Sequence, residues 1–171
     1  RGGVVEKIFI ENIRMNDIGG AAILFDMYYM AVDPLTRKDG DASTLDFEPV
    51  TEATPQFRDI HIKNVVCNGA ETGIFVRGLP EMNVRNINMD DIRIKSDKGF
   101  VCVEGEGITL RNATLHCKDD EVVVQVQNTK DLTLDRIAFE PSTVLMTVSG
   151  DRSENIRVIN SGKRTKEQVA L

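Results

Sequence analysis

Ile8-Phe9-Ile10-Glu11-Asn12 is the stretch that decides the fold, because its pattern returns along the chain. The pattern is an apolar residue, any residue, a second apolar residue, any residue and Asn. It returns at residues 60–64, 82–86, 108–112, 132–136 and 156–160, with Arg136 as the one substitution for Asn. Alternation of this kind is typical of half-buried strands, and its regular return is typical of a solenoid.

The interval between the repeats indicates stacked coils. The later repeats end on Asn64, Asn86, Asn112, Arg136 and Asn160. These positions are 22, 26, 24 and 24 residues apart, which is enough for three short strands per coil. The first step, from Asn12 to Asn64, is 52 residues, and we interpret it as two coils with a few inserted residues.

The recurring Asn has a physical role at the bend between two strands. Asn adopts the left-handed backbone conformation more readily than other non-glycine residues. When such residues stack at one corner, their amides can hydrogen-bond from coil to coil. No segment carries a helical apolar stripe over ten residues. The sequence therefore predicts an all-β fold, a right-handed parallel β-helix of about seven coils of 22–26 residues.

The same pattern predicts the domain organisation. Residues 1–161 are expected to form one β-helix domain with a loop insertion at 30–54, followed by a C-terminal tail at 162–171. The first coil of such a helix has strand edges and apolar side chains that no earlier coil in this sequence covers. We therefore expect self-association through this open N-terminal coil.

Composition excludes several classes of partner. The formal net charge of -6 argues against a nucleic-acid partner, because phosphate binding requires clustered Lys and Arg. No apolar run approaches the roughly 20 residues that cross a bilayer, so no membrane partner is expected. Cys67, Cys102 and Cys117 lie among apolar strand residues and are expected to be buried free thiols. Ligand spacing for a metal is missing, and no cofactor is expected.

Two stretches resemble a known family of enzymes. Arg-Gly-Gly-Val-Val-Glu-Lys-Ile at 1–8 and Gly-Gly-Ala-Ala-Ile-Leu-Phe-Asp-Met-Tyr-Tyr at 19–29 resemble the later coils of bacterial polygalacturonases. Residues 96–100, leading into 107–112, are similar to the last coils of the same family. The resemblance covers nearly the whole chain, and it is specific only in the opening third. It implies an acidic plant polysaccharide as the partner and a periplasmic or secreted parent enzyme.

The family hydrolyses galacturonic acid polymers with inversion, which requires one carboxylic acid and one carboxylate. In the family these groups lie in an Asn-Thr-Asp motif and an Asp-Asp pair, followed by Gly-His-Gly and Arg-Ile-Lys. None of the four motifs can be matched in order in this sequence. The chain is therefore expected to be the C-terminal part of such an enzyme, without catalytic residues and inactive alone.

Three short motifs have the same residue types as catalytic or substrate-binding motifs, but their context differs. Asp90-Asp91 and Arg93-Ile94-Lys95 spell two family motifs, but they are adjacent on one strand and its turn. Alternation predicts that Ile92 and Ile94 point inward and that the charged residues form a solvated face. The acidic run at 119–121 precedes another strand and is expected to be a solvated turn.

The resemblance also nominates substrate-binding residues. Tyr28 best matches an active-site tyrosine of the family, and Tyr29 is the second choice. A phenol ring at this position could stack on a sugar and hydrogen-bond through its hydroxyl. Asp26 is on the opposite side of its strand from Phe25 and is predicted to line the groove, while Arg1 is predicted to face an anionic substrate.

Other functions stay open at this point. A non-catalytic polysaccharide-binding module is one alternative, although the few aromatic residues and the negative charge disfavour it. A purely structural solenoid is another, although it needs neither the Tyr28-Tyr29 element nor an irregular loop. A lyase of similar fold would need acidic calcium-binding clusters, and the sequence contains no such cluster.

Overall fold

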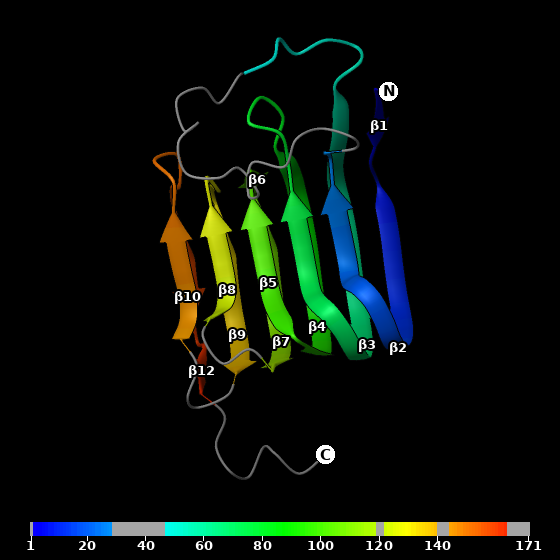
Figure 1. Cartoon of the computed structure of the whole chain (residues 1–171), viewed down its shortest axis with the longest axis vertical. Coiled ribbons are helices and arrows are strands. Elements are labelled where there is room, and N and C mark those ends of the chain that lie inside the picture. Colours follow the sequence, from blue (N-terminus) through cyan, green and yellow to red (C-terminus); the bar gives the residue numbers. More distant parts are fainter. Residues whose placement is uncertain (1, 29–46, 119–121, 140–143, 164–171) are drawn as a thin grey trace.

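The computed structural model shows short strands stacked side by side around an apolar core (Figure 1). The structure describes residues 2–28, 47–118, 122–139 and 144–163. Within these ranges the regular structure consists of strands, and every pair of neighbouring strands is parallel. The all-β, parallel, solenoid-like class predicted from the sequence is confirmed.

Twelve strands are assigned within the described part of the chain. They are β1 (Gly3–Val5), β2 (Ile8–Asp26), β3 (Pro55–Arg77), β4 (Val84–Ser96), β5 (Lys98–Val103), β6 (Gly105–Glu106), β7 (Thr109–Cys117), β8 (Val122–Gln127), β9 (Thr133–Phe139), β10 (Val144–Ser149), β11 (Arg157–Ile159) and β12 (Gly162–Lys163).

The sheet curls because the long strands turn corners. β3 pairs with β4 over its first half and with β5 over its last residues, 72–77. The order therefore continues from the end of β3 through β5 and β8 to β10 on one side, and through β4, β7 and β9 to β11 on the other. We call the first side, together with residues 21–26 of β2, the front sheet; it faces the viewer in Figure 1.

Equivalent residues of successive coils stack in the core. One stack consists of Ile62, Met89, Leu110 and Leu134, each at most 4% exposed. The apolar positions of the repeat thus point inward and the residues between them point outward, as their alternation predicted. Burial of such side chains is the main source of stability, at about 25 cal/mol for each Å² of apolar surface removed from water.

One corner of the coil repeats at six levels of the described structure. The residues at this corner have left-handed backbone, with φ between 49° and 61°, and their flanking residues pair in register. They are Asn12, Asn64, Asp91, Asn112, Arg136 and Asn160. We call this set the corner column. The described structure thus has six levels at this corner, one fewer than the roughly seven coils expected from the sequence.

A second corner, five residues earlier in each coil, also has left-handed backbone. Its members are Lys7, Asp59, Asn86, Gly107, Asp131 and Asn155. Asn86 therefore belongs to this second corner, and Asp91 takes the place in the corner column that the sequence repeat assigned to Asn86. That alignment was wrong because both corners accept Asn or Asp and alternating apolar residues flank both.

The interpretation of the 52-residue step as two coils was also wrong. Asn12 lies directly beside Asn64, whose side-chain amide donates to the Asn12 Oδ1 at 2.6 Å. β2 and β3 pair along most of their length, so the step is one coil that carries one long insertion between Asp26 and Pro55. At the other end, β12 adds Gly162 and Lys163 to the sheet, within the segment predicted as a tail.

Side chains at the corners hydrogen-bond toward the preceding coil. Asn112 donates to the Asp90 Oδ1 at 2.6 Å and accepts from the Arg136 Nε at 2.6 Å. Beside the corner column, the paired residues Glu11, Lys63, Asp90, Arg111 and Asp135 alternate in charge from coil to coil. Opposite charges on paired strand positions are stabilising, so the polar exterior supports the same register as the core.

The N-terminal edge of the sheet is open in the described structure. Ile8 is 37% exposed, whereas its partner one coil later, Ile60, is 2% exposed. Phe9, which stacks on His61 with ring centroids 5.0 Å apart, is 71% exposed. Unpaired strand edges favour association, and self-association through this coil remains a prediction.

The corner column predicts how Asn112 substitutions affect stability. Asn112→Ala removes both side-chain hydrogen bonds and places alanine at φ 49°, so we expect a loss of about 2 kcal/mol. Asn112→Gly removes the same bonds without the backbone penalty and should cost about 1 kcal/mol less than alanine. Urea denaturation measures both changes. Equal stability of the two variants would contradict a left-handed corner at this position.

Candidate functional site

An ion pair joins the ends of two neighbouring strands of the front sheet. Arg77, the last residue of β3, donates from Nε and Nη2 to the two carboxylate oxygens of Asp26 at 2.9 and 2.6 Å. The backbone amide of Tyr28 donates to the same carboxylate at 2.9 Å. A two-pronged arginine–carboxylate pair has a fixed geometry, so it sets the path of the chain as it leaves β2.

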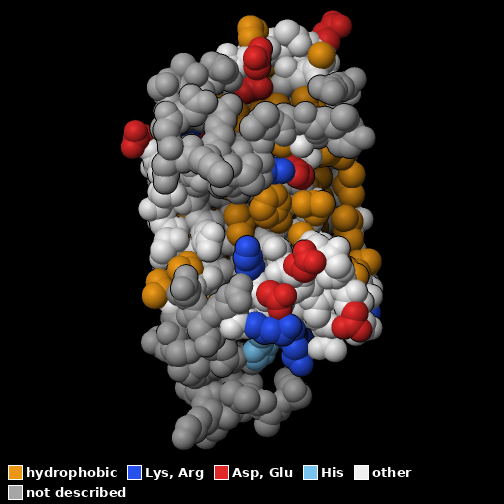
Figure 2. Space-filling view, viewed as in Figure 1, with side chains coloured by type: hydrophobic (Ala, Val, Ile, Leu, Met, Phe, Trp, Pro, Cys, Tyr) orange, Lys and Arg blue, Asp and Glu red, His pale blue; other side chains and the backbone are white. Residues whose placement is uncertain are grey.

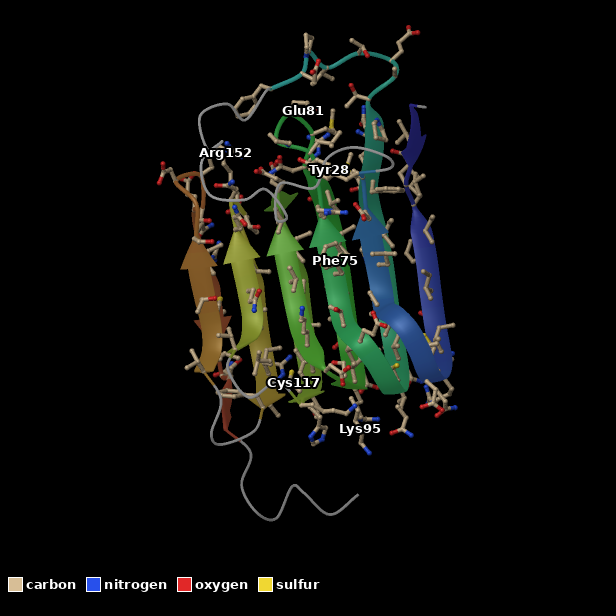
Figure 3. The ribbon with its side chains drawn as sticks, in the orientation of Figure 1. Tyr28, Phe75, Glu81, Lys95, Cys117 and Arg152 are labelled. Carbon is tan, nitrogen blue, oxygen red and sulfur yellow. The ribbon has the colours of Figure 1, made fainter. Side chains whose placement is uncertain are left out.

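Aromatic rings pack on the Arg77 guanidinium. Its carbon lies 5.0 Å from the ring centroid of Tyr28 and 5.3 Å from that of Phe75. Contacts of this kind attract the cation to the ring face. Arg77 is only 8% exposed, so the pair with Asp26 and the two rings form one partly buried unit at the end of the front sheet (Figure 3). We call Asp26, Tyr28, Phe75 and Arg77 the Tyr28 cluster.

The structure brings together two of the four residues nominated from the sequence. Tyr28 and Asp26 lie in one cluster, where Asp26 orients the backbone of Tyr28. Arg1 and Tyr29 lie outside the described residues. Sequence reasoning missed Arg77, because the 52-residue step was interpreted as two coils. With a one-coil step, the register places Arg77 directly opposite Asp26.

A large cavity adjoins the Tyr28 cluster. Its volume is about 970 Å³, and its walls include β1, residues 48–57, Asp26 and Glu81. Apolar side chains such as Met27 and Phe57 form much of the wall. This volume falls within the range of known ligand pockets. Asp26 therefore lines this cavity and also binds the Arg77 guanidinium.

A second charged group lies at the same end of the front sheet. Glu104 is buried, accepts from the Asn128 amide at 3.0 Å and is paired with Arg152. The Arg152 guanidinium carbon lies 5.0 Å from the ring centroid of Phe47. Burial raises the pKa of Glu104 above its usual value, and the nearby Arg152 opposes this shift. Sequence reasoning missed this group, because nothing in the repeat marks the end of the third strand.

An apolar strip crosses the front sheet and includes Phe75 of the Tyr28 cluster. Leu24, Phe75 and Val101 occupy paired positions on adjacent strands and point outward. Leu24 is 59% exposed. Figure 2 shows hydrophobic side chains gathered in the middle of this face, with charged side chains on both sides of them. We call these three residues the apolar strip.

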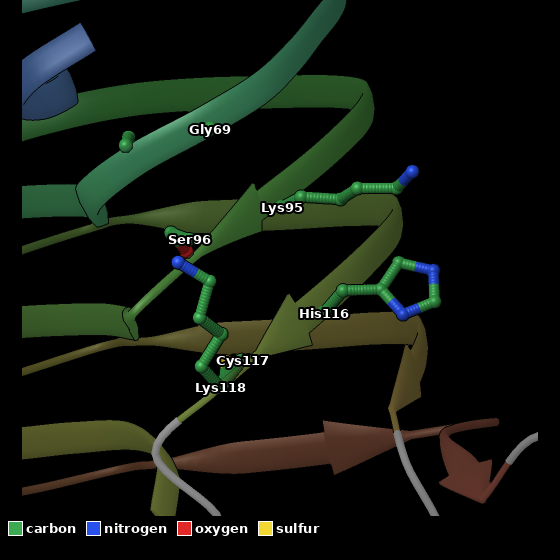
Figure 4. A pocket seen from close by; sticks show the side chains of 7 residues that line it. Gly69, Lys95, Ser96, His116, Cys117 and Lys118 are labelled. Atoms are coloured by element: carbon green, nitrogen blue, oxygen red, sulfur yellow. The ribbon is translucent and has the colours of Figure 1, made fainter. Parts of the chain in front are cut away.

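Another pocket, of about 200 Å³, lies near the opposite end of the front sheet (Figure 4). Lys95, His116 and Lys118 line it, and Lys118 pairs with Asp97 at 2.7 Å. Lys95 comes from the stretch that spells Arg-Ile-Lys. Arg93 of that stretch pairs with Asp91 at 3.0 Å.

The neighbours of these charged residues show which way the side chains of the stretch point. Ile92 and Ile94 are fully buried, at 0% and 1% exposure. The charged residues of the stretch are therefore the outer face of an ordinary strand, as predicted.

The described residues contain no group of three or more His, Cys, Asp or Glu side chains placed to hold a metal ion. They also contain no helix long and apolar enough to span a membrane. Cys67 and Cys102 are buried free thiols, as expected, and Cys117 is half-buried.

Comparisons with known proteins add no family assignment. No protein-family model matches the chain, and neither does any curated protein or any solved structure. The geometry described above is therefore the basis on which a function can be proposed.

The buried carboxyl of Glu104 predicts a pH effect on stability. Because its pKa is raised in the folded state, the folded protein retains the proton more strongly than the unfolded chain. The resulting stabilisation is complete below pH 4.5, which is the ordinary pKa of a glutamate side chain. It is lost as the pH rises through the higher pKa that Glu104 has in the folded protein. The free-energy difference between wild type and Glu104→Gln should therefore change with pH above 4.5, as measured by urea denaturation. A constant difference from pH 4 to 8 would contradict a raised pKa.

Proposed function

We propose that this chain is the C-terminal β-helix part of a glycoside hydrolase that acts on a galacturonan-type polysaccharide. The proposal includes right-handed coiling like that of polygalacturonases, since crossovers between parallel strands of one sheet are nearly always right-handed. Two independent considerations support it: the resemblance of residues 1–8 and 19–29, and the site on the front sheet.

The observation that carries the proposal is the placement of Tyr28. Asp26 fixes its backbone, Arg77 packs against its ring, and the apolar strip begins beside it. A ring held in this way loses little conformational freedom when a sugar packs on it, which favours binding. The adjoining apolar strip offers a flat surface for the apolar faces of further sugar rings.

Local charge makes an acidic saccharide acceptable despite the net charge of -6. Arg77, Lys98 and Arg152 all belong to the front sheet or to the turns at its end. Arg77 is compensated by Asp26 and Arg152 by Glu104, whereas Lys98 is exposed to solvent. A carboxylate-bearing ligand would therefore meet a cation at the edge of this face.

The two carboxylates at this end of the front sheet are not arranged for hydrolysis. Inverting glycosidases need one carboxylic acid and one carboxylate that are free to reach the glycosidic bond and a water molecule. Asp26 is bound to Arg77, and Glu104 is bound to Asn128 and Arg152. These pairings also favour the second candidate function, a polysaccharide-binding module without catalysis. Under either reading the chain alone binds saccharide without cleaving it.

Tyr28→Ala tests this site. Loss of the ring should weaken binding of trigalacturonate about threefold to tenfold, because aromatic packing contributes about 0.5–1.5 kcal/mol. Calorimetric titration measures the affinity, and an assay of reducing-sugar release from polygalacturonate should show no hydrolysis.

Phe9→Ala is the matched control, because it removes an exposed ring from the opposite side of the sheet. It should leave the affinity unchanged. Trigalacturonate that fails to bind, or that binds Tyr28→Ala and wild type equally, would refute the site. Hydrolysis by this chain would refute the assignment of its carboxylates.

A further inference from the structure

A small hollow lies on the front sheet at the start of β5 and β8, next to the apolar strip. Its volume is about 130 Å³, and its lining includes Lys98, Gly99, Val101, Val123 and Gln125. Val101 belongs to both the hollow and the apolar strip, so the two features are continuous. A ligand on the strip would therefore extend into the hollow.

Glycine explains why the floor of the hollow is backbone. Gly99 follows Lys98 at the start of β5, and a Cβ atom there would lie 2.1 Å from the carbonyl oxygen of Val123. Only glycine allows β5 and β8 to approach this closely. Gly73 occupies the same level of β3, where a Cβ atom would lie 3.0 Å from the Gly99 oxygen. At these two positions no side chain projects from the strands, so the space between the neighbouring valines stays open.

The hollow offers two kinds of polar group. Lys98 is exposed and forms no ion pair with any residue that the structure describes, whereas Lys118 at the adjacent corner is paired with Asp97. Gln125 is also exposed, and it lies on the outward side of β8 opposite Val101. An ammonium group attracts a carboxylate, and a primary amide both donates to and accepts from hydroxyl groups.

The spacing of these groups suits one sugar ring. Lys98 lies opposite Val122 in the register, three residues before Gln125, so the two Cα atoms are roughly 11 Å apart. Lys98 and Gln125 both line the hollow, so a pyranose ring seated in it would lie within reach of both residues. A ring seated there could present its carboxylate to Lys98 and its hydroxyl groups to Gln125.

We propose that the Lys98–Gln125 hollow is a binding subsite for one uronic acid residue of an acidic saccharide, with Lys98 holding its carboxylate. The subsite rests on the proposed function, because the rest of the saccharide would lie along the apolar strip toward Tyr28. The hollow lies at the Val101 end of the strip, whereas Leu24, on the strand that leads to Tyr28, lies at the other end. The subsite therefore extends the site onto further coils rather than duplicating the Tyr28 cluster.

Nuclear magnetic resonance titration of the whole chain with trigalacturonate tests the subsite. In the wild type the backbone amides of Val101 and Gln125 should shift and saturate. Lys98→Gln should weaken binding about tenfold, because a charge-assisted hydrogen bond is lost. Lys63→Gln, which removes an exposed lysine from the opposite side of the sheet, is the matched control and should change the affinity less than twofold.

Neutral trigalactose should bind wild type and Lys98→Gln equally, because it has no carboxylate for Lys98. A titration with sodium sulfate distinguishes a saccharide subsite from a site that binds any oxyanion. If sulfate shifts the Val101 and Gln125 amides with the same affinity as trigalacturonate, the assignment to a sugar carboxylate is overturned.

Two further outcomes separate the subsite from the proposed function. If Tyr28→Ala weakens binding of trigalacturonate and Lys98→Gln does not, the subsite is wrong and the proposed function stands. If trigalacturonate does not bind the wild type at all, both are wrong.

Discussion

The rest of the structure depends on one backbone constraint, the left-handed residue at each corner of the coil. A chain of L-residues enters this conformation at a cost, and Asn and Asp tolerate it better than most. Eleven non-glycine residues in the two corner sets adopt it, and six of them have side chains that donate a hydrogen bond to the coil before them. Every strand that follows is thereby placed in register, with its apolar residues directly over those of the preceding coil.

The geometry of the candidate site is a consequence of that register. Asp26 and Arg77 are 51 positions apart in the sequence, yet they end adjacent strands and form one ion pair. Leu24, Phe75 and Val101 align across three strands for the same reason. A slip of one residue would turn the strip into the core and separate the ion pair. The proposed saccharide site is therefore as well ordered as the corners that set the register.

Much of the fold could be predicted from the sequence, because the apolar alternation and the corner residues recur at nearly constant spacing. The exact alignment of successive coils could not be predicted, because Asn86 and Asp91 are both residue types that suit a left-handed corner. The long insertion could not be told from an additional coil by length alone. That error also hid Arg77, whose role depends on which coil lies beside Asp26. Tyr28 was nominated by resemblance, whereas Lys98 and Glu104 carry no signal until the strands are placed.

The central claim is that the coil containing Asn12 lies directly on the coil containing Asn64. Nitroxide labels at Glu11 and Lys63, which are exposed and paired in register, measure this distance in a Cys117→Ser background. The paired register places the two Cα atoms about 5 Å apart, so strong dipolar broadening of the spectrum is expected. A second pair at Glu11 and Asp90, two levels apart, should show weaker broadening. If the first pair shows no more broadening than the second, a further coil separates the two strands and the paired register of β2 and β3 is wrong.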